Sequence, residues 1–171
     1  AVRSSTPKVC REALKEAYGV LLREGEDALR EYVSNFEREF NQMPFEDISF
    51  PRSCRYINKW KDAAMIYKKG TPIHVRGTLL YNKLIKDKKL TRKFDFIHEG
   101  DKIKFCYMKL PNPIRENVFA VPTVLPEELG LGQFVDYDKQ FSKSFKEPLD
   151  NICQAVGWSL EKQFDLTAFF G

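Results

Sequence analysis

The spacing of apolar residues predicts two amphipathic helices at the start of the chain. The apolar positions that recur at helical intervals are Val9, Ala13, Leu14, Ala17, Val20 and Leu21 in a first stretch, and Leu29, Tyr32, Val33, Phe36 and Phe40 in a second. Thr6 offers a capping hydroxyl ahead of Pro7 at the first helical position, Gly25 separates the stretches, and Pro44 follows them. We expect a helical segment over residues 7–42 whose apolar stripes face a core.

A change of pattern predicts a different structure for residues 44–125. Pro51, Gly70 and Pro72 interrupt any periodicity over residues 44–72, which favours irregular backbone. Leucines over residues 79–84 suggest one short helix. Residues 103–107 alternate between apolar and polar, as in a half-buried strand, and we expect the apolar run 118–121 to pair with them.

A helical pattern returns over residues 126–157. Its apolar positions are Phe141, Phe145, Leu149, Ile152 and Val156. Pro148 lies inside this stripe and predicts a kink or break. The whole pattern predicts an α+β fold that is mostly helical, with a small antiparallel β-rich middle. We expect one domain over residues 1–160 and a separate peptide over residues 161–171.

Composition excludes several classes of function. The chain of 171 residues can bury a core, and no run approaches the ~18 apolar residues of a membrane span. The four cysteines form no Cys-x-x-Cys; they could form two disulfides, but we interpret them as buried thiols in a reducing compartment. His74 and His98 fit no metal-binding spacing, and no glycine-rich phosphate loop occurs. We expect no catalytic residue, metal site or cofactor in this chain.

The net charge of +4 hides a strong asymmetry. Residues 51–104 hold fifteen Lys and Arg against five Asp and Glu, a net charge of +10, between acidic ends. Aromatic and hydrogen-bonding residues are interleaved with the basic ones over residues 52–61, which is typical of a surface that binds a polyanion. For residues 83–93 we favour the alternative, a solvated lysine-rich surface. For residues 52–76 we favour nucleic acid, because Arg, Ser, Asn and Tyr commonly contact phosphate and sugar.

The end of the chain matches a short linear pattern. Gln163, Leu166, Phe169 and Phe170 fit Gln-x-x-aliphatic-x-x-aromatic-aromatic, which is similar to the peptide that binds sliding clamps. One turn of tight helix would gather its three apolar side chains into a plug for a hydrophobic groove, with the glutamine at the rim. The alternative is a terminal segment that folds back on the core of its own chain.

Several short runs together carry a resemblance to a known family. They are Arg3–Lys8, Glu24-Gly25-Glu26, Lys68–Gly77, Tyr81-Asn82, Asn112-Pro113 and Lys143–Leu149. In this order and spacing, and ending in the clamp-like peptide, they resemble the C-terminal thumb region of the family B DNA polymerases of T-even-type phages and their marine or environmental relatives. The resemblance covers essentially the whole chain.

The resemblance implies a role and a set of residues. A thumb grips the primer–template duplex along its sugar–phosphate backbone and minor groove, and the final peptide tethers the polymerase to the sliding clamp. The implied duplex contacts are Arg3, Arg52, Ser53, Lys59, Arg76 and Lys143, joined by Arg55, Lys68 and Lys69 in the same segments. Asn117 and Glu147 stand where the family has basic residues, and Arg115 and Lys146 lie nearby in sequence.

The resemblance also implies that this chain is the C-terminal part of a larger enzyme. It begins at Ala1 and not at a methionine, and the polymerase's catalytic carboxylates, with their two divalent ions (Mg²⁺ expected), would lie upstream. The implied partners are double-stranded DNA, the sliding clamp, and the palm and fingers, in the cytoplasm of an infected bacterium, with no membrane. The alternatives are a self-contained nucleic-acid-binding replication or repair adaptor with a clamp-binding tail, and a small nuclease.

Overall fold

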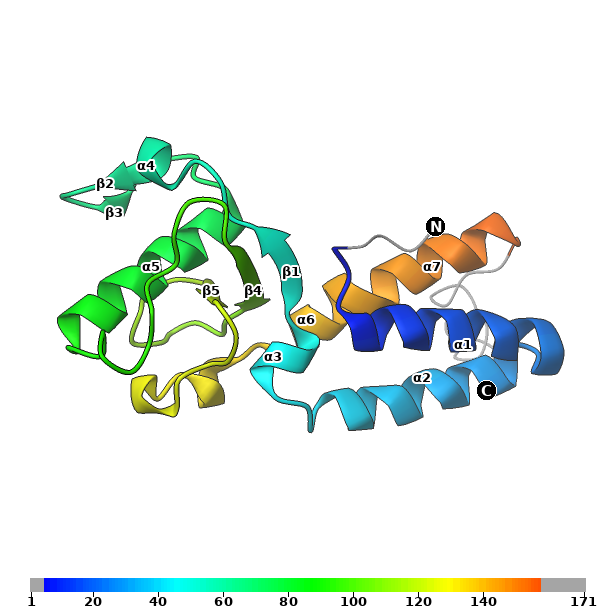
Figure 1. Ribbon diagram of the computed structural model, residues 1–171. Coiled ribbons are helices and arrows are strands. Elements are labelled where there is room, and N and C mark those ends of the chain that lie inside the picture. The colour runs from blue at the N-terminus through cyan, green and yellow to red at the C-terminus, as the bar shows by residue number, and fades with distance from the viewer. Residues whose placement is uncertain (1–4, 158–171) are drawn as a thin grey trace. The chain divides into compact units, whose positions relative to one another are not determined.

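The computed structural model describes residues 5–157, which form two compact units. The first unit comprises the chain up to Met43 and from Asp138 onward, and the second comprises Pro44–Tyr137. Helices and a three-stranded antiparallel sheet make up the fold, which confirms the predicted α+β class (Figure 1). The predicted boundary between residues 160 and 161 lies outside the described residues. No helix within residues 5–157 is long and apolar enough to cross a membrane.

The first unit is built on two long helices. Helix α1, Lys8–Glu24, packs against α2, Glu26–Phe40, and against α7, Glu147–Ala155 (Figure 1). Gly25 joins α1 to α2 with a φ of 90°, a left-handed conformation that glycine adopts without penalty. Pro7 is the N-cap of α1, so the helix begins one residue later than predicted. Its carbonyl accepts the N–H groups of Cys10 and Arg11.

Phenylalanine rings from α2 and from the C-terminal helical segment form the centre of this unit. The ring centroids of Phe36 and Phe145 lie 4.8 Å apart, and those of Phe40 and Phe141 lie 5.0 Å apart. Both pairs meet edge to face, the arrangement that aromatic quadrupoles favour. All four side chains are buried, so the apolar stripes of the sequence do face a core.

The kink predicted at Pro148 takes the form of a wide helical turn. Helix α6, Tyr137–Phe141, runs into a π-helical turn over Ser142–Lys146 and then into α7. Pro148 has no N–H to offer, and its ring crowds the carbonyl four residues earlier. The turn before it therefore widens instead of breaking the helix.

The second unit contains the sheet, in the strand order β1-β4-β5. Strand β4, Lys102–Tyr107, pairs antiparallel with β5, Val118–Val121, as predicted. The third strand, β1, Phe50–Ser53, was not predicted, because Pro51 interrupts the sequence pattern. Proline is tolerated there because β1 is an edge strand.

Strand β4 is covered on both faces, although its alternating sequence predicted a half-buried strand. Neighbouring side chains on a strand point to opposite faces, and both Phe105 and Cys106 are buried. The Phe105 ring lies 6.3 Å from that of His74 in helix α5, and the Cys106 sulfur lies 3.1 Å from Ser49 Oγ, next to the short helix α3, Phe45–Ile48. Two different elements thus cover the two faces.

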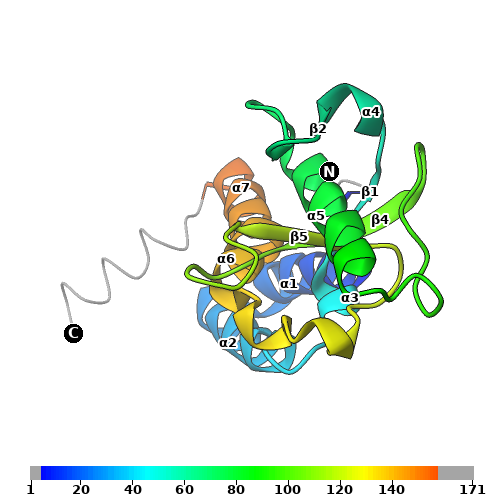
Figure 2. The same ribbon diagram turned by 90° about the vertical axis from the view of Figure 1, so that its left-hand side faces the viewer.

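Helix α5, Ile73–Asp87, is longer than the short helix predicted and crosses β5 (Figure 2). The remaining elements are α4, Ile57–Trp60, the hairpin of β2, Lys61–Asp62, and β3, Ile66–Tyr67, and two 3-10 turns, Glu127–Leu129 and Gly132–Phe134. Over residues 126–136 the predicted helical zone is therefore limited to these short turns.

Two of the runs that carry the family resemblance fix loops of the second unit. The Tyr81 hydroxyl donates to the carbonyl of Asp95, and the Asn82 amide both donates to and accepts from the backbone of Ile97. Asn112 bonds the backbone of its own loop through three hydrogen bonds. These residues therefore position backbone, and their side chains are engaged inside the protein.

All four cysteines are free and buried, which confirms their interpretation as buried thiols. Burial raises the pKa of Cys10 and of Cys153 to about 11, and it raises that of Cys106 further. Each thiol is therefore protonated and weakly nucleophilic at neutral pH.

Candidate nucleic-acid interface

The edge strand β1 presents the first predicted contact residues. Arg52 and Ser53 are exposed, and their strand register opposes them to Ile103 and Lys102 of β4. Beyond the strand, Cys54 continues the ladder: its N–H donates to the Asp101 carbonyl at 2.8 Å, and its own carbonyl accepts the Gly100 N–H at 2.7 Å. Ordered backbone therefore holds these side chains.

Arg52 also lies close enough to helix α5 to influence the pKa of His74 in that helix. Burial lowers the pKa of His74, and the positive charge of Arg52 lowers it further. His74 is therefore neutral at pH 7. Arg52 itself is exposed and lies near the first turn of α5.

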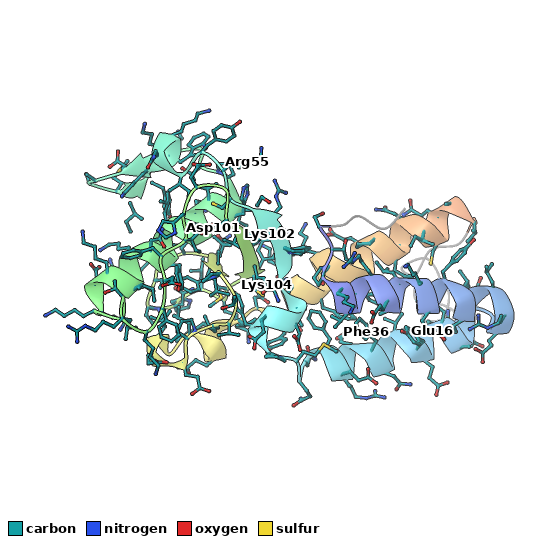
Figure 3. The ribbon with its side chains drawn as sticks, in the orientation of Figure 1. Glu16, Phe36, Arg55, Asp101, Lys102 and Lys104 are labelled. Carbon is teal, nitrogen blue, oxygen red and sulfur yellow. The ribbon has the colours of Figure 1, made fainter. Side chains whose placement is uncertain are left out.

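The loop after β1 is held by one carboxylate. Glu99 accepts the backbone N–H of Tyr56 at 2.8 Å and that of Ile57 at 3.0 Å, two donors at the start of helix α4. Arg55 lies within this loop and is exposed (Figure 3). Lys59 lies over two rings, with its ammonium 4.9 Å from the centroid of Trp60 and 6.0 Å from that of Tyr56.

The hairpin of β2 and β3 leads to the next two predicted contacts. The Asp62 carboxylate accepts the N–H groups of Ala64 and Met65 at the tip, and these bonds hold its pKa below the ordinary value. Lys68 and Lys69 follow β3 and are exposed. The hairpin is thus a short ordered support for two cations.

Arg76 differs from the other predicted contacts of this unit, because it is paired inside the protein. Its guanidinium lies 2.8 Å from Glu116 Oε1, and the two side chains are only 26% and 16% exposed. The Tyr67 hydroxyl donates to the other carboxylate oxygen. Burial opposes ionisation of Glu116, but the bonds from Tyr67, the Asn117 N–H and Arg76 outweigh it and lower its pKa. The carboxylate is therefore charged and fully engaged.

The remaining predicted contacts lie in the first unit, in another loop of the second unit or outside the described residues. Lys143 belongs to the first unit, where its ammonium lies 3.3 Å from Glu147, and Lys146 lies 3.6 Å from Glu37. Arg115 is exposed in the loop before β5. Arg3, Gln163, Leu166, Phe169 and Phe170 lie outside the described residues.

Five of the predicted contacts in the second unit are exposed cations that share one property. Among residues 5–157, no carboxylate lies within ion-pair distance of any of them. They are Arg52, Arg55, Lys59, Lys68 and Lys69. A cation without a carboxylate partner is available to a phosphate without breaking an ion pair.

Strand pairing adds a residue that the sequence analysis left out. Lys102 is exposed and lies directly opposite Ser53, and Figure 3 shows it with Lys104 along β4. Lys104 instead donates to the carbonyl of Glu46 at 3.2 Å. The alternating pattern of residues 102–107 was the available signal, but without β1 it could not place Lys102 beside Ser53.

A groove of about 980 Å³ lies between the hairpin segment, α5 and the loop over residues 91–99. Its lining combines apolar side chains such as Leu79 and Phe96 with Lys61 and Lys86. Within residues 5–157, no group of three or more His, Cys, Asp or Glu side chains is placed to hold a metal ion.

Comparison of the sequence with known proteins identifies relatives of this chain. No family model matches the chain. The DNA-directed DNA polymerase of Enterobacteria phage T4 is 32% identical to it over 173 residues, which cover 99% of this chain. The chain is thus related to the DNA polymerases of T4-type phages. The polymerase of Escherichia phage RB69 is also 32% identical over 173 residues, or 98% of the chain. These matches confirm the predicted resemblance, and the chain spans 19% of the length of each polymerase.

Proposed function

We propose that this chain is the thumb region of a phage family B DNA-directed DNA polymerase and that its second unit grips the primer–template duplex. Similarity to two phage polymerases over nearly the whole chain supports a place in such an enzyme. The grip itself is proposed from five predicted contacts of the second unit, which are exposed cations with no carboxylate partner among residues 5–157. The exposure of these cations, without carboxylate partners, is the single observation that carries the proposal.

The contacts proposed for these cations are with phosphates, and they carry no sequence information. Arg52, Arg55 and Lys59 lie on and just after an edge strand, and Lys68 and Lys69 lie after the hairpin. Side chains of this kind fix a protein on a duplex by neutralising phosphates, which are the same in every sequence. A replicative enzyme needs this behaviour because it must hold whatever sequence it has just copied.

The chemistry of nucleotide addition is assigned to other parts of the proposed polymerase. We expect its palm and fingers to supply the catalytic carboxylates and their two divalent ions, and we expect this chain to be inactive alone. Its place of action would be the cytoplasm of the infected bacterium. Arg76 and Lys143 are assigned to the fold, because each is paired with a glutamate in its own unit.

The terminal peptide is proposed as the tether to the sliding clamp. Gln163, Leu166, Phe169 and Phe170 have the side chains such a peptide needs, namely an amide for the rim and three apolar anchors for a groove. Replacing Phe169 and Phe170 with alanine should abolish clamp binding in surface plasmon resonance and leave duplex affinity unchanged. A large fall in melting temperature would instead assign the two rings to the chain's own core.

Binding to two unrelated duplexes tests the grip. Fluorescence anisotropy should show that Arg55→Ala weakens binding of the 171-residue chain to both duplexes by the same factor. Lys15→Ala is the matched control, because Lys15 is an exposed cation of α1 in the first unit. A loss on one sequence alone would mean that Arg55 reads bases, and equal losses for both variants would mean that the binding surface is not in the second unit.

A further inference from the structure

Tyr56 combines a strained backbone with an exposed ring. Its φ and ψ are 66° and 33°, in the left-handed region, and the residue is 65% exposed. A bulky residue adopts this conformation only when its surroundings enforce it. Here the enforcing groups are visible: Glu99 accepts the N–H of Tyr56 and that of the next residue, and Cys54 is bonded to the turn at residues 100–101.

The effect of this strain is to present an aromatic ring to solvent. The fold gives the Tyr56 ring little to pack against, since nearly two thirds of the residue's surface stays exposed. Burial of the ring therefore cannot account for the conformation. Strained residues of this kind cluster where a protein meets a ligand.

The neighbours of the ring indicate the chemistry of that ligand. The Lys59 ammonium lies 6.0 Å from the Tyr56 centroid, and Arg55 is the preceding residue. An exposed aromatic face flanked by cations is the combination by which proteins hold unpaired nucleotides, with the base on the ring and the phosphate on the cation. Purely apolar partners would leave both cations without a partner.

We propose that Tyr56 is a stacking platform for an unpaired nucleobase beside the duplex held by the second unit. The assignment rests on the proposed function, because the duplex brings the unpaired nucleotide to this loop. Arg55 and Lys59 would contact the flanking phosphates, and Glu99 is a positioning residue that fixes the loop. The Tyr56 hydroxyl is not needed, since stacking uses only the face of the ring.

Three forms of the 171-residue chain and two DNA molecules test the proposal. The DNA molecules are a blunt duplex and the same duplex with a single-stranded tail of a few nucleotides. Tyr56→Asn removes the ring but keeps a residue that tolerates the left-handed conformation, so the fold should survive. Tyr56→Phe keeps the ring and removes only the hydroxyl.

The unmodified chain should bind the tailed duplex about tenfold more tightly than the blunt one, within the range for stacking of one base. Tyr56→Phe should keep this preference and Tyr56→Asn should lose it, with affinity for the blunt duplex and the salt dependence unchanged. A preference that survives in Tyr56→Asn, or an equal loss on both DNA molecules, would overturn the stacking assignment while the duplex grip stands. No binding of the unmodified chain to the blunt duplex would overturn the proposed grip itself.

Discussion

The pairing of Arg76 with Glu116 predicts that Arg76→Ala affects stability before it affects DNA binding. Removing the Arg76 guanidinium leaves the Glu116 carboxylate, which is only 16% exposed, without this cationic partner. Exposed ion pairs contribute about 0.2–1 kcal/mol, and breaking a buried pair costs about 3–5 kcal/mol. The pair lies between these limits, so we expect the free energy of unfolding to fall by about 2 kcal/mol.

Urea denaturation followed by the fluorescence of Trp60 measures this change in the second unit. A Trp158→Phe background removes the other tryptophan of the chain, so that the signal comes from one place. Arg52→Ala is the matched control, because Arg52 is exposed and has no carboxylate partner among residues 5–157. Its stability should change by less than about 0.5 kcal/mol.

For DNA affinity we expect the reverse order of effects, with the larger loss in Arg52→Ala. Without urea, and at a temperature where both variants are folded, Arg52→Ala should weaken duplex binding. Arg76→Ala should bind the duplex almost as the unmodified chain does. The reasoning would be refuted by an Arg76→Ala variant of unchanged stability that has lost duplex affinity. That result would mean that Arg76 leaves Glu116 and contacts a phosphate.

Three further predictions concern the fold. Gly77→Ala should destabilise the second unit by about 1–2 kcal/mol, because a Cβ there would lie 2.8 Å from the backbone N of Ala120. Gly19→Ala should stabilise the first unit by about 0.5–1 kcal/mol, because only the flexible Arg23 side chain lies near. Changes of the same sign in the free energy of unfolding of both variants, measured by urea denaturation, would contradict this. The four thiols should resist alkylation at pH 7.5 in the folded chain and react at once in denaturant, as mass spectrometry would record, and fast labelling of the native chain would show the burial to be wrong. The lowered pKa of Glu116 contributes stability that is present above the ordinary value of 4.5 and is lost as pH falls through the folded pKa. Below pH 4.5 the free energy of unfolding should therefore fall more steeply with pH in the unmodified chain than in Glu116→Gln. Parallel curves would mean that ionisation of Glu116 does not stabilise the fold.

Much of the fold could be predicted from the sequence because it depends on local patterns. The stripes of α1 and α2, the break at Gly25 and the pairing of residues 102–107 with 118–121 follow from periodicity and turn chemistry. Strand β1 could not be predicted because its signal is erased by Pro51, which an edge strand tolerates. The full extent of α5 was also missed: the helix packs on β5, and such a contact between segments far apart in sequence leaves no signal in the local pattern.

The candidate site could be predicted only in part, for a related reason. The sequence shows which residues carry charge but not which of them are already paired. Arg52 and Arg76 both belong to the basic segment, yet one is exposed beside α5 and the other is held by Glu116, forty residues further along the chain. Tyr56 is a plain tyrosine in the sequence, and its left-handed backbone is held by contacts with Glu99 and with the turn at residues 100–101, which are distant in sequence.

The dependence of duplex affinity on salt measures how many phosphates the second unit neutralises. Five phosphate contacts, from Arg52, Arg55, Lys59, Lys68 and Lys69, predict that log K falls with log salt concentration with a slope of about −4 to −5. Anisotropy titrations of the chain with a blunt duplex between 50 and 200 mM salt, roughly the range over which such slopes are measured, give this value. A slope near the predicted one, reduced by about one in Arg55→Ala and unchanged in Arg76→Ala, is the expected result. An affinity that hardly changes with salt would contradict the claim that this surface holds DNA by its phosphates.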